Sequence, residues 1–345
     1  MMTLQEDPSN NNLFKRPVPV YLIPLAILVS FFIVYYFFPS PSKTKKTTIV
    51  SVQSDCADEM EILRNKDFKF THPAYLYDVR NENPAYAPLK EKLNQFIALS
   101  KSSKGLMDIS IYFRNLNTGE WFTINGGQVY NPASLIKVAF LIAMLKQSSG
   151  HPQLLDKQVF FARHYEKANT PNIIDFKLEE QKYYSIKQLL YYMIVNSDND
   201  AAELIRQNVK PDVVIKVFSD LGLPLPPVKA EEYFISVIDY CKFFRVLFNA
   251  SYLGENNSDL ALEFLSKSTF KEGLLKDLHI TFPVAHKFGE RIMNDIEQLH
   301  ETGIFYTDQK PYLLGVMSSG HNLKELSSIL SQVSQIVYLE STKLN

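Results

Sequence analysis

The hydrophobic positions of the chain form one continuous apolar run and, after it, a long region in which apolar and polar residues alternate with regular periods. The run, VPVYLIPLAILVSFFIVYYFF, covers residues 18–38 and carries no charge. At a rise of about 1.5 Å per residue, a helix of this length crosses a hydrocarbon core of about 30 Å. A cleavable signal peptide is the alternative, but its apolar region is shorter and leads into small residues, whereas this run ends in aromatic residues. The pattern therefore predicts a retained membrane anchor.

The rest of the pattern predicts how the chain is divided. The residues after the anchor are rich in Pro, Ser, Thr and Lys, which is typical of a tether. A helical period that places Leu93, Phe96 and Ile97 on one face predicts an amphipathic helix near 89–99. We expect four parts, namely a short tail over 1–17, the anchor over 18–38, the tether with an N-terminal extension over 39–104, and one folded domain over 105–345.

Within the folded domain, strand periods lie on both sides of a helical block. The predicted elements are, in chain order, strands at 107–113 and 121–126 joined by a turn at 115–120, helices from 134 to about 253, strands at 281–288, 302–307 and 312–318, and a helix over 322–337. This order indicates an α+β fold, in which an antiparallel β-sheet is flanked by helices.

Composition and charge narrow the function classes. The chain has 345 residues, of which 46% are hydrophobic and 21% charged, as expected for one large domain with appendages. The formal net charge of −1 gives no reason to expect a nucleic-acid partner. The histidines and cysteines lack metal-ligand spacing, and no glycine-rich phosphate loop occurs, so we expect neither metal nor cofactor. We interpret His286 and His300 as hydrogen-bonded structural residues and Cys241 as a buried small hydrophobe.

The first motif that carries chemistry is Ser134-Leu135-Ile136-Lys137, which opens the apolar helical segment LIKVAFLIAMLK. Residues three apart share a helical face, so the Lys137 amine can reach the Ser134 hydroxyl. Free N–H groups at a helix start suit an oxyanion, and apolar neighbours favour a neutral lysine that can act as a base. The alternative is a serine that caps the helix, followed by a surface lysine.

Two further motifs follow. Ser197-Asp198-Asn199 lies between two helical segments, where it is either a polar capping loop or a proton relay with a substrate-binding amide. Lys287-Phe288-Gly289 ends an apolar strand. There the lysine is either solvated or attracts a substrate carboxylate, and the glycine either marks a bend or lets a substrate backbone approach.

The order and spacing of the three motifs are more specific than any one of them. They are 63 positions (134 to 197) and then 90 positions (197 to 287) apart, in the order S-x-x-K, S-D-N and K-T-G that marks class A β-lactamases and penicillin-binding proteins. Over roughly residues 105–340 the chain resembles the class A β-lactamase-like serine hydrolase family.

The resemblance implies a role for each site residue. Ser134 would be the nucleophile, Lys137 the general base and Ser197 the proton relay. The backbone N–H groups of Ser134 and Glu290 would hold the oxyanion. The substrate would be bound by Asn199, Lys287 and Gly289.

Two departures from the family pattern concern substrate and turnover. Phe288 stands where the family usually has Thr or Ser, so a hydroxyl that helps to hold a substrate carboxylate is missing. The E-x-x-L-N setting of the glutamate that activates the deacylating water is also missing. Glu231 and Glu232 are the only carboxylates of the stretch 221–236 and are the candidates for that base.

The resemblance implies a membrane-anchored serine hydrolase that forms an acyl-enzyme with β-lactams or acyl-D-Ala-D-Ala-like amides and hydrolyses it. One alternative is a penicillin-binding D,D-carboxypeptidase or transpeptidase that acts on peptidoglycan stem peptides and deacylates slowly. An alternative of another class is a catalytically silent module that binds cell wall or a partner protein. Family members act outside the cytoplasmic membrane, so we expect a single-pass protein of the cell membrane whose folded domain is extracytoplasmic.

Overall fold

A computed structural model describes the chain over the ranges 49–52, 60–65, 71–165, 176–226, 233–307 and 310–341, together with residues 67 and 69. The predicted anchor over 18–38 lies outside these ranges. Within them, no helix combines the length and the apolar character that crossing a membrane requires.

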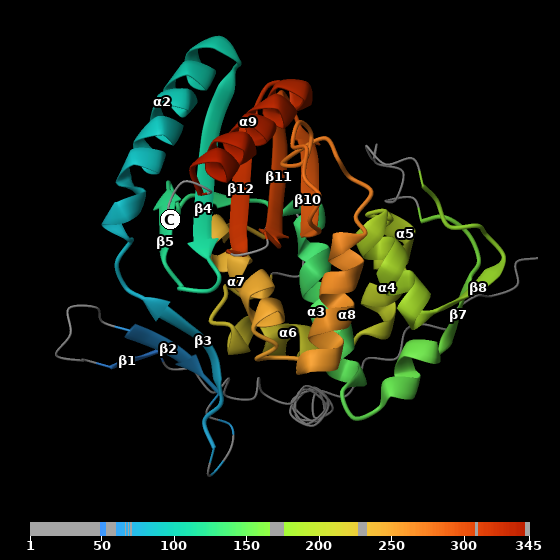
Figure 1. Cartoon of the computed structure of the whole chain (residues 1–345). Helices are drawn as coiled ribbons and strands as arrows, with labels where there is room; N and C mark the ends of the chain where they lie inside the picture. Colours follow the sequence, from blue (N-terminus) through green and yellow to red (C-terminus); the bar gives the residue numbers. More distant parts are fainter. Residues whose placement is uncertain are drawn as a thin grey trace, which may run out of the picture. The chain divides into compact units, whose positions relative to one another are not determined.

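A five-stranded antiparallel sheet organises the described part of the folded domain (Figure 1). Its strands, in spatial order, are β10 (Val284–Met293), β11 (Ile296–Phe305), β12 (Tyr312–Gly320), β4 (Leu106–Asn115) and β5 (Trp121–Ile124). The C-terminal strands therefore join the N-terminal hairpin through the pairing of β12 with β4. This order leaves β10 as an edge strand, so one side of its backbone is open to other partners.

Helices cover both faces of this sheet (Figure 1). α2 (Ala87–Ser103) and α9 (Leu323–Ser341) pack together on one face. The other face carries α3 (Lys137–Ser148), α4 (Ile186–Val195), α5 (Asn199–Asn208), α6 (Pro211–Asp220), α7 (Val237–Phe248) and α8 (Glu255–Ser266). Single 3-10 turns are η1 (Pro84–Tyr86), η2 (Ala133–Ile136) and η3 (Pro152–Asp156). Two short ribbons pair β6 (Val129–Tyr130) with β9 (Ile235–Ser236) and β7 (Gln158–Phe161) with β8 (Lys182–Ser185).

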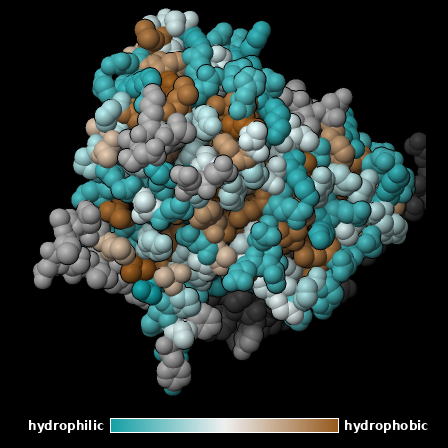
Figure 2. All heavy atoms as spheres, viewed as in Figure 1, coloured by the Kyte–Doolittle hydropathy of each residue, from teal (hydrophilic) through white to brown (hydrophobic). Residues whose placement is uncertain are grey.

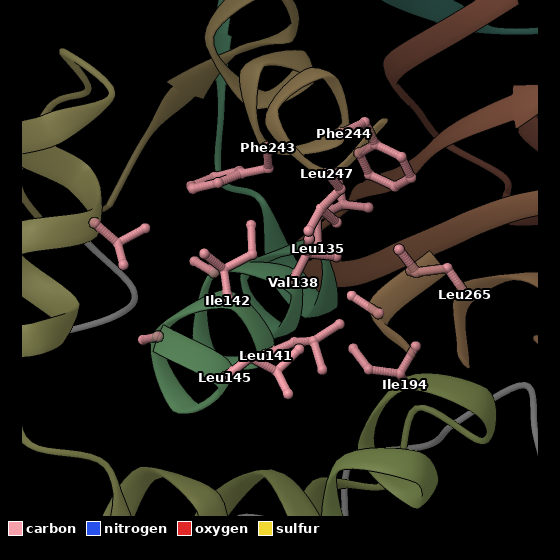
Figure 3. Packing of buried hydrophobic residues seen from close by; sticks show 14 of the residues in the cluster. Leu135, Val138, Leu141, Ile142, Leu145, Ile194, Phe243, Phe244, Leu247 and Leu265 are labelled. Carbon is pink, nitrogen blue, oxygen red and sulfur yellow. The ribbon is translucent and has the colours of Figure 1, made fainter. Parts of the chain in front are cut away.

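α3 is the central helix of the larger hydrophobic core. Its sequence is apolar on nearly every side, and such a helix is stable only when neighbours surround it. In Figure 3, Leu141 and Leu145 of α3 lie close to Ile194 of α4, and Phe243 and Leu247 of α7 lie on another side of the helix. Packing on all sides fixes the position of α3, and with it the position of η2 at its N-terminal end.

The alternation of side chains along β10 assigns its residues to two different cores. Ala285 belongs to the core around α3, whereas Val284 and Phe288 belong to the core under α2 and α9. Successive side chains of a strand point to opposite faces, so Lys287 and Gly289 share the α3 face and Glu290 shares the face of Phe288. On the surface viewed in Figure 2, hydrophobic residues form small patches among hydrophilic ones.

The N-terminal extension forms a separate three-stranded sheet of β1 (Ile49–Val52), β2 (Met60–Arg64) and β3 (Ala74–Val79). Asp78 of β3 binds two buried guanidinium groups, those of Arg114 at 2.7 Å and Arg245 at 2.8 Å. Both arginines also donate to the backbone oxygen of Tyr77. One carboxylate thus connects this sheet to β4 and α7.

The α+β fold with an antiparallel sheet and flanking helices is confirmed. The amphipathic helix near 89–99 is α2, and buried Cys241 confirms its interpretation as a small hydrophobe. Three sequence predictions were wrong. β11 begins at Ile296 instead of 302, because buried His300 and Glu301 make a core strand look polar. β10 ends at Met293 instead of 288, and α8 was not predicted.

Candidate active site

The three sequence motifs meet where the N-terminal end of α3 faces the edge strand β10. Ser134 lies in η2 and is partly exposed, and Lys137 begins α3 and is buried. Ser197 lies in the turn between α4 and α5, with its hydroxyl 3.3 Å from the Lys137 Nζ. Lys287 of β10 donates to the same hydroxyl at 2.8 Å. The fold therefore gathers residues of all three motifs around one serine oxygen.

Lys137 is held by the second motif. Its Nζ donates to the backbone oxygen of Ser197 at 2.5 Å and to the Oδ1 of Asn199 at 2.7 Å. Among the contacts of the described residues, the Ser134 hydroxyl makes no hydrogen bond with Lys137, although the two residues lie one helical turn apart. The alternative of a surface lysine is wrong, because Lys137 is buried.

Burial lowers the pKa of both lysines. Desolvation brings the pKa of Lys137 to about 7, against an opposing effect of the Asp198 and Glu290 carboxylates. The pKa of Lys287 is lowered well below its ordinary value, first by desolvation and then by the charge of Lys137, with Glu301 and Glu290 opposing. Near neutral pH the two lysines therefore carry less than two full positive charges between them.

In the second motif, Asp198 caps a helix and Ser197 has an unusual backbone conformation. The Asp198 carboxylate accepts from the Ala201 N–H at 2.6 Å and caps α5, which confirms the capping interpretation for this residue. Ser197 has a φ of 55°, in the left-handed region that a residue other than glycine rarely adopts. Such backbone strain is concentrated at functional sites, and here it accompanies a serine that two lysines contact.

The third motif brings β10 into close contact with η2. A Cβ atom at Gly289 would lie 2.6 Å from the Pro132 backbone oxygen and 3.0 Å from the Leu135 nitrogen. Only glycine allows this approach. Lys287 is completely buried, so the alternative of a solvated strand lysine is wrong. Gly289 lies within the paired part of β10 and does not end the strand.

Phe288 is packed away from the solvent. Its ring stacks on Phe270, which follows α8, with 3.9 Å between the ring centroids, and it is buried. The Lys287 Nζ lies 4.2 Å from the centroid of the same ring and donates to the Phe288 backbone oxygen at 3.0 Å. The ring of Phe288, which stands in the sequence where a hydroxyl residue is usual, is thus packed in the core and lies against the lysine amine.

A buried histidine supports the segment that leads into Ser134. The Ser318 N–H donates to the Nδ1 of His300, so the ring proton is on Nε2, which donates to the Asn131 oxygen at 3.1 Å. Desolvation lowers the pKa of His300 to about 4, which keeps the ring neutral. The Asn131 side chain accepts from the N–H of Ala133, whose φ is 48°. The interpretation of His300 as a structural residue is confirmed.

A second buried histidine lies behind Lys287. The Nδ1 of His286 is 2.6 Å from the Oε1 of Glu301, and the other oxygen of that carboxylate accepts from the Leu274 N–H at 2.6 Å. This confirms the structural interpretation of His286. Neither Phe270 nor Glu301 was predicted from the sequence as part of the site's surroundings, because no local motif signals their long-range contacts.

Glu231 and Glu232, the candidate deacylation bases, lie outside the described residues. Among the residues that are described, no group of three or more His, Cys, Asp or Glu side chains is placed to hold a metal ion.

Comparisons with known proteins agree with this architecture. The model of the β-lactamase enzyme family matches residues 88–340. A β-lactamase from Chitinophaga pinensis superposes with a TM-score of 0.63 at 18% identity, covering 74% of this chain and 99% of that one. PBP-A gives 0.63 at 20% identity, covering 76% and 98%. The TLA-3 extended-spectrum β-lactamase gives 0.64 at 17% identity, covering 74% and 98%. No curated protein matches the chain.

The contact of Gly289 with η2 predicts the effect of its substitution. Gly289→Ala should lower the free energy of unfolding by about 1–3 kcal/mol, because the new methyl group meets backbone atoms that cannot move aside freely. Denaturant unfolding measures this loss. Gly127→Ala is the matched control, since a Cβ atom there meets no atom within 4 Å. Equal stability of the two variants would contradict a tight contact between β10 and η2.

Proposed function

The chain belongs to the β-lactamase enzyme family, and we propose that it is a serine hydrolase whose Ser134 forms a covalent acyl-enzyme. The observation that carries this proposal is that Lys137, one helical turn after Ser134, and Lys287 both contact the Ser197 hydroxyl. A buried lysine with a pKa of about 7 is present partly as the neutral amine at neutral pH. Strongly perturbed groups of this kind mark functional sites.

The proposed acylation moves one proton along this group of residues. Neutral Lys137 removes the proton from the Ser134 hydroxyl as its oxygen bonds to the acyl carbon. The C–N bond of the amide then breaks, and the leaving nitrogen takes a proton from the hydroxyl of Ser197. Ser197 is reprotonated by the lysine ammonium that contacts it, so the proton taken from Ser134 ends on the leaving amine.

Two backbone N–H groups would stabilise the oxyanion. The first is that of Ser134, at the start of η2. The second is that of Glu290 on the open edge of β10. The Phe288 oxygen accepts from Lys287 on the side of the site, and peptide groups that face one side of a strand recur every second residue. The Glu290 N–H is therefore expected to face the same side.

The proposed substrates are β-lactams or acyl-D-Ala-D-Ala-like amides. Asn199 and Lys287 offer polar groups to such a substrate, and Gly289 lets β10 lie close to η2 beside them. A mutant of PBP-A, which superposes at a TM-score of 0.62 and 20% identity, was solved as an acyl-enzyme complex with penicillin G. That likeness gives a precedent for this chemistry on the fold.

Hydrolysis and slow release remain two versions of the proposal. β-Lactamase-type turnover needs a base for deacylation, and Glu231 and Glu232 stay the candidates. Without such a base the acyl-enzyme would persist, as in a penicillin-binding carboxypeptidase or transpeptidase. The silent-module alternative is disfavoured, because burying two lysines against one hydroxyl is costly and a binding surface does not need it.

Labelling with a fluorescent penicillin separates these versions. We expect a label on the full-length wild-type protein and none on Ser134→Ala, since the variant lacks the nucleophilic oxygen. A label that persists for hours would indicate the penicillin-binding version, and one that is lost within seconds would indicate a β-lactamase. Equal labelling of wild type and Ser134→Ala would contradict the assignment of the nucleophile.

The depressed pKa of Lys137 predicts a pH profile. The amine is neutral above its pKa, so the acylation rate should rise with pH through about 7 and level off above it. Stopped-flow acylation between pH 5 and 9 measures the profile, with Ser134→Ala as the control for spontaneous hydrolysis. A rise centred near pH 10 would show that Lys137 titrates as an ordinary solvated lysine and would contradict its role as the base.

We further propose that residues 18–38 anchor the chain and leave residues 39–345 on the extracytoplasmic side, where peptidoglycan lies. Protease added to spheroplasts should digest the folded domain while a cytoplasmic marker stays intact. A chain without residues 18–38 should leave the membrane fraction. Protection of the domain until the membrane is permeabilised would contradict this topology.

A further inference from the structure

A pocket lies between the N-terminal sheet and the catalytic fold, and no residue of the three motifs lines it. Its volume is about 380 Å³, near the lower end of the range of about 300–1,000 Å³ that is usual for small-molecule sites. One wall comes from β2, β3 and Arg80, which precede the range 88–340 matched by the family model. The pocket is therefore a feature that the extension adds to the family fold.

The N-terminal sheet lines the pocket with one of its faces. Glu61 of β2 pairs with Asp78 of β3, and Leu63 pairs with Leu76, so these four lining residues lie on the same side of the sheet. β3 lies next to α7 (Figure 1). The second wall of the pocket belongs to that helix.

α7 lines the pocket with Ile238, Lys242 and Arg245. These residues are four and then three positions apart, so they lie on one side of the helix. Arg245 is buried and Lys242 is half-buried. Two cationic groups, one helical turn apart, thus face the same pocket.

Most of the remaining lining is apolar. Leu221, which follows α6, and Trp121 of β5 add to the leucines of the sheet. The ring of Trp121 stacks on Tyr112, with 6.0 Å between the ring centroids. Its indole N–H donates to the Val79 oxygen at 2.8 Å, so the ring is left to offer its apolar surface. Such a lining suits a hydrocarbon body of a ligand.

The charged residues around the pocket leave one positive charge over. Those that line it are Arg80, Lys242, Arg245, Glu61 and Asp78. The Asp78 carboxylate is shared by Arg245 and the buried Arg114, so one carboxylate serves two guanidinium groups. Lys242 pairs with Asp239 at 2.7 Å, and Arg80 pairs with Glu61 at 3.5 Å. Among these described residues there are four cations and three carboxylates, which favours a ligand with a single negative charge.

Arg245 also has donors for such a ligand. A guanidinium group carries five N–H donors. The contacts of Arg245 with the two oxygens of Asp78 and with the Tyr77 backbone oxygen use three of them. A carboxylate is the group that a guanidinium binds with paired hydrogen bonds. The Lys242 ammonium, on the same side of α7, would add a further donor.

We propose that this pocket binds a small organic anion, whose single carboxylate is held by Arg245 and Lys242 and whose apolar body packs against Trp121. This inference is independent of the proposed function, because none of its residues takes part in the acylation at Ser134.

The test uses a fluorescent group that the chain supplies. Trp121 is the only tryptophan of the sequence, so tryptophan emission reports on the pocket alone. The full-length protein is titrated with 4-phenylbutyrate and with its uncharged amide, which has the same size and lacks the charge. Lys242→Gln removes one cation of the pocket, and Lys242→Arg restores it. Lys267→Gln, at the end of α8, is the matched control for loss of a paired lysine outside the pocket.

We expect 4-phenylbutyrate to change the emission of the wild type saturably, with a dissociation constant on the order of 1 mM, as is usual for a ligand of this size. The amide should bind about tenfold more weakly, because it loses a hydrogen bond between charged groups. Lys242→Gln should weaken binding of the acid by a similar factor and leave that of the amide within about twofold. Lys242→Arg and Lys267→Gln should bind the acid as the wild type does.

Three results would overturn the proposal. The first is no saturable change of emission with 4-phenylbutyrate, and the second is equal binding of acid and amide by the wild type. The third is binding of the acid by Lys242→Gln with the affinity of the wild type. Each of them leaves the acylation of Ser134 to be decided by its own labelling experiment.

Discussion

The burial of two lysines around one serine hydroxyl is the constraint on which the site depends. Lys137 and Lys287 both contact the hydroxyl of Ser197, and neither is open to solvent. Isolated in an apolar interior, each charge would be strongly unfavourable. The structure reduces this cost by hydrogen bonds to the second motif and by lowered pKa values, so that the amines can be neutral near neutral pH. The neutral amine of Lys137 that results is also the base that the proposed chemistry needs.

The surrounding fold keeps these groups together. α3 is packed on nearly all sides, so the Ser134 and Lys137 end of this helix has little freedom to move. The edge strand β10 approaches η2 closely at Gly289, which brings Lys287 to the site. His300 joins the sheet to Asn131 just before η2. The N-terminal sheet is attached elsewhere, through the ion pairs of Asp78 with Arg114 of β4 and Arg245 of α7.

The sequence predicted those parts of the site that local patterns encode. Apolar periodicity around Ser134 indicated a buried helix, and the order of the three motifs indicated which residues meet. Contacts between distant residues could not be read in this way. The stacking of Phe288 on Phe270 and the binding of Leu274 by Glu301 depend on loops that only the folded chain brings to β10. Buried polar residues also made β11 look shorter than it is.

The central claim is that Ser134 is the nucleophile of an acyl-transfer site. Its most direct test is tandem mass spectrometry of peptides from the wild-type protein after reaction with a β-lactam. The account predicts one adduct, with the mass of the intact β-lactam, on the Ser134 hydroxyl. An adduct on Ser197 or on Lys137, with Ser134 unmodified, would contradict the account and require another interpretation of the same cluster.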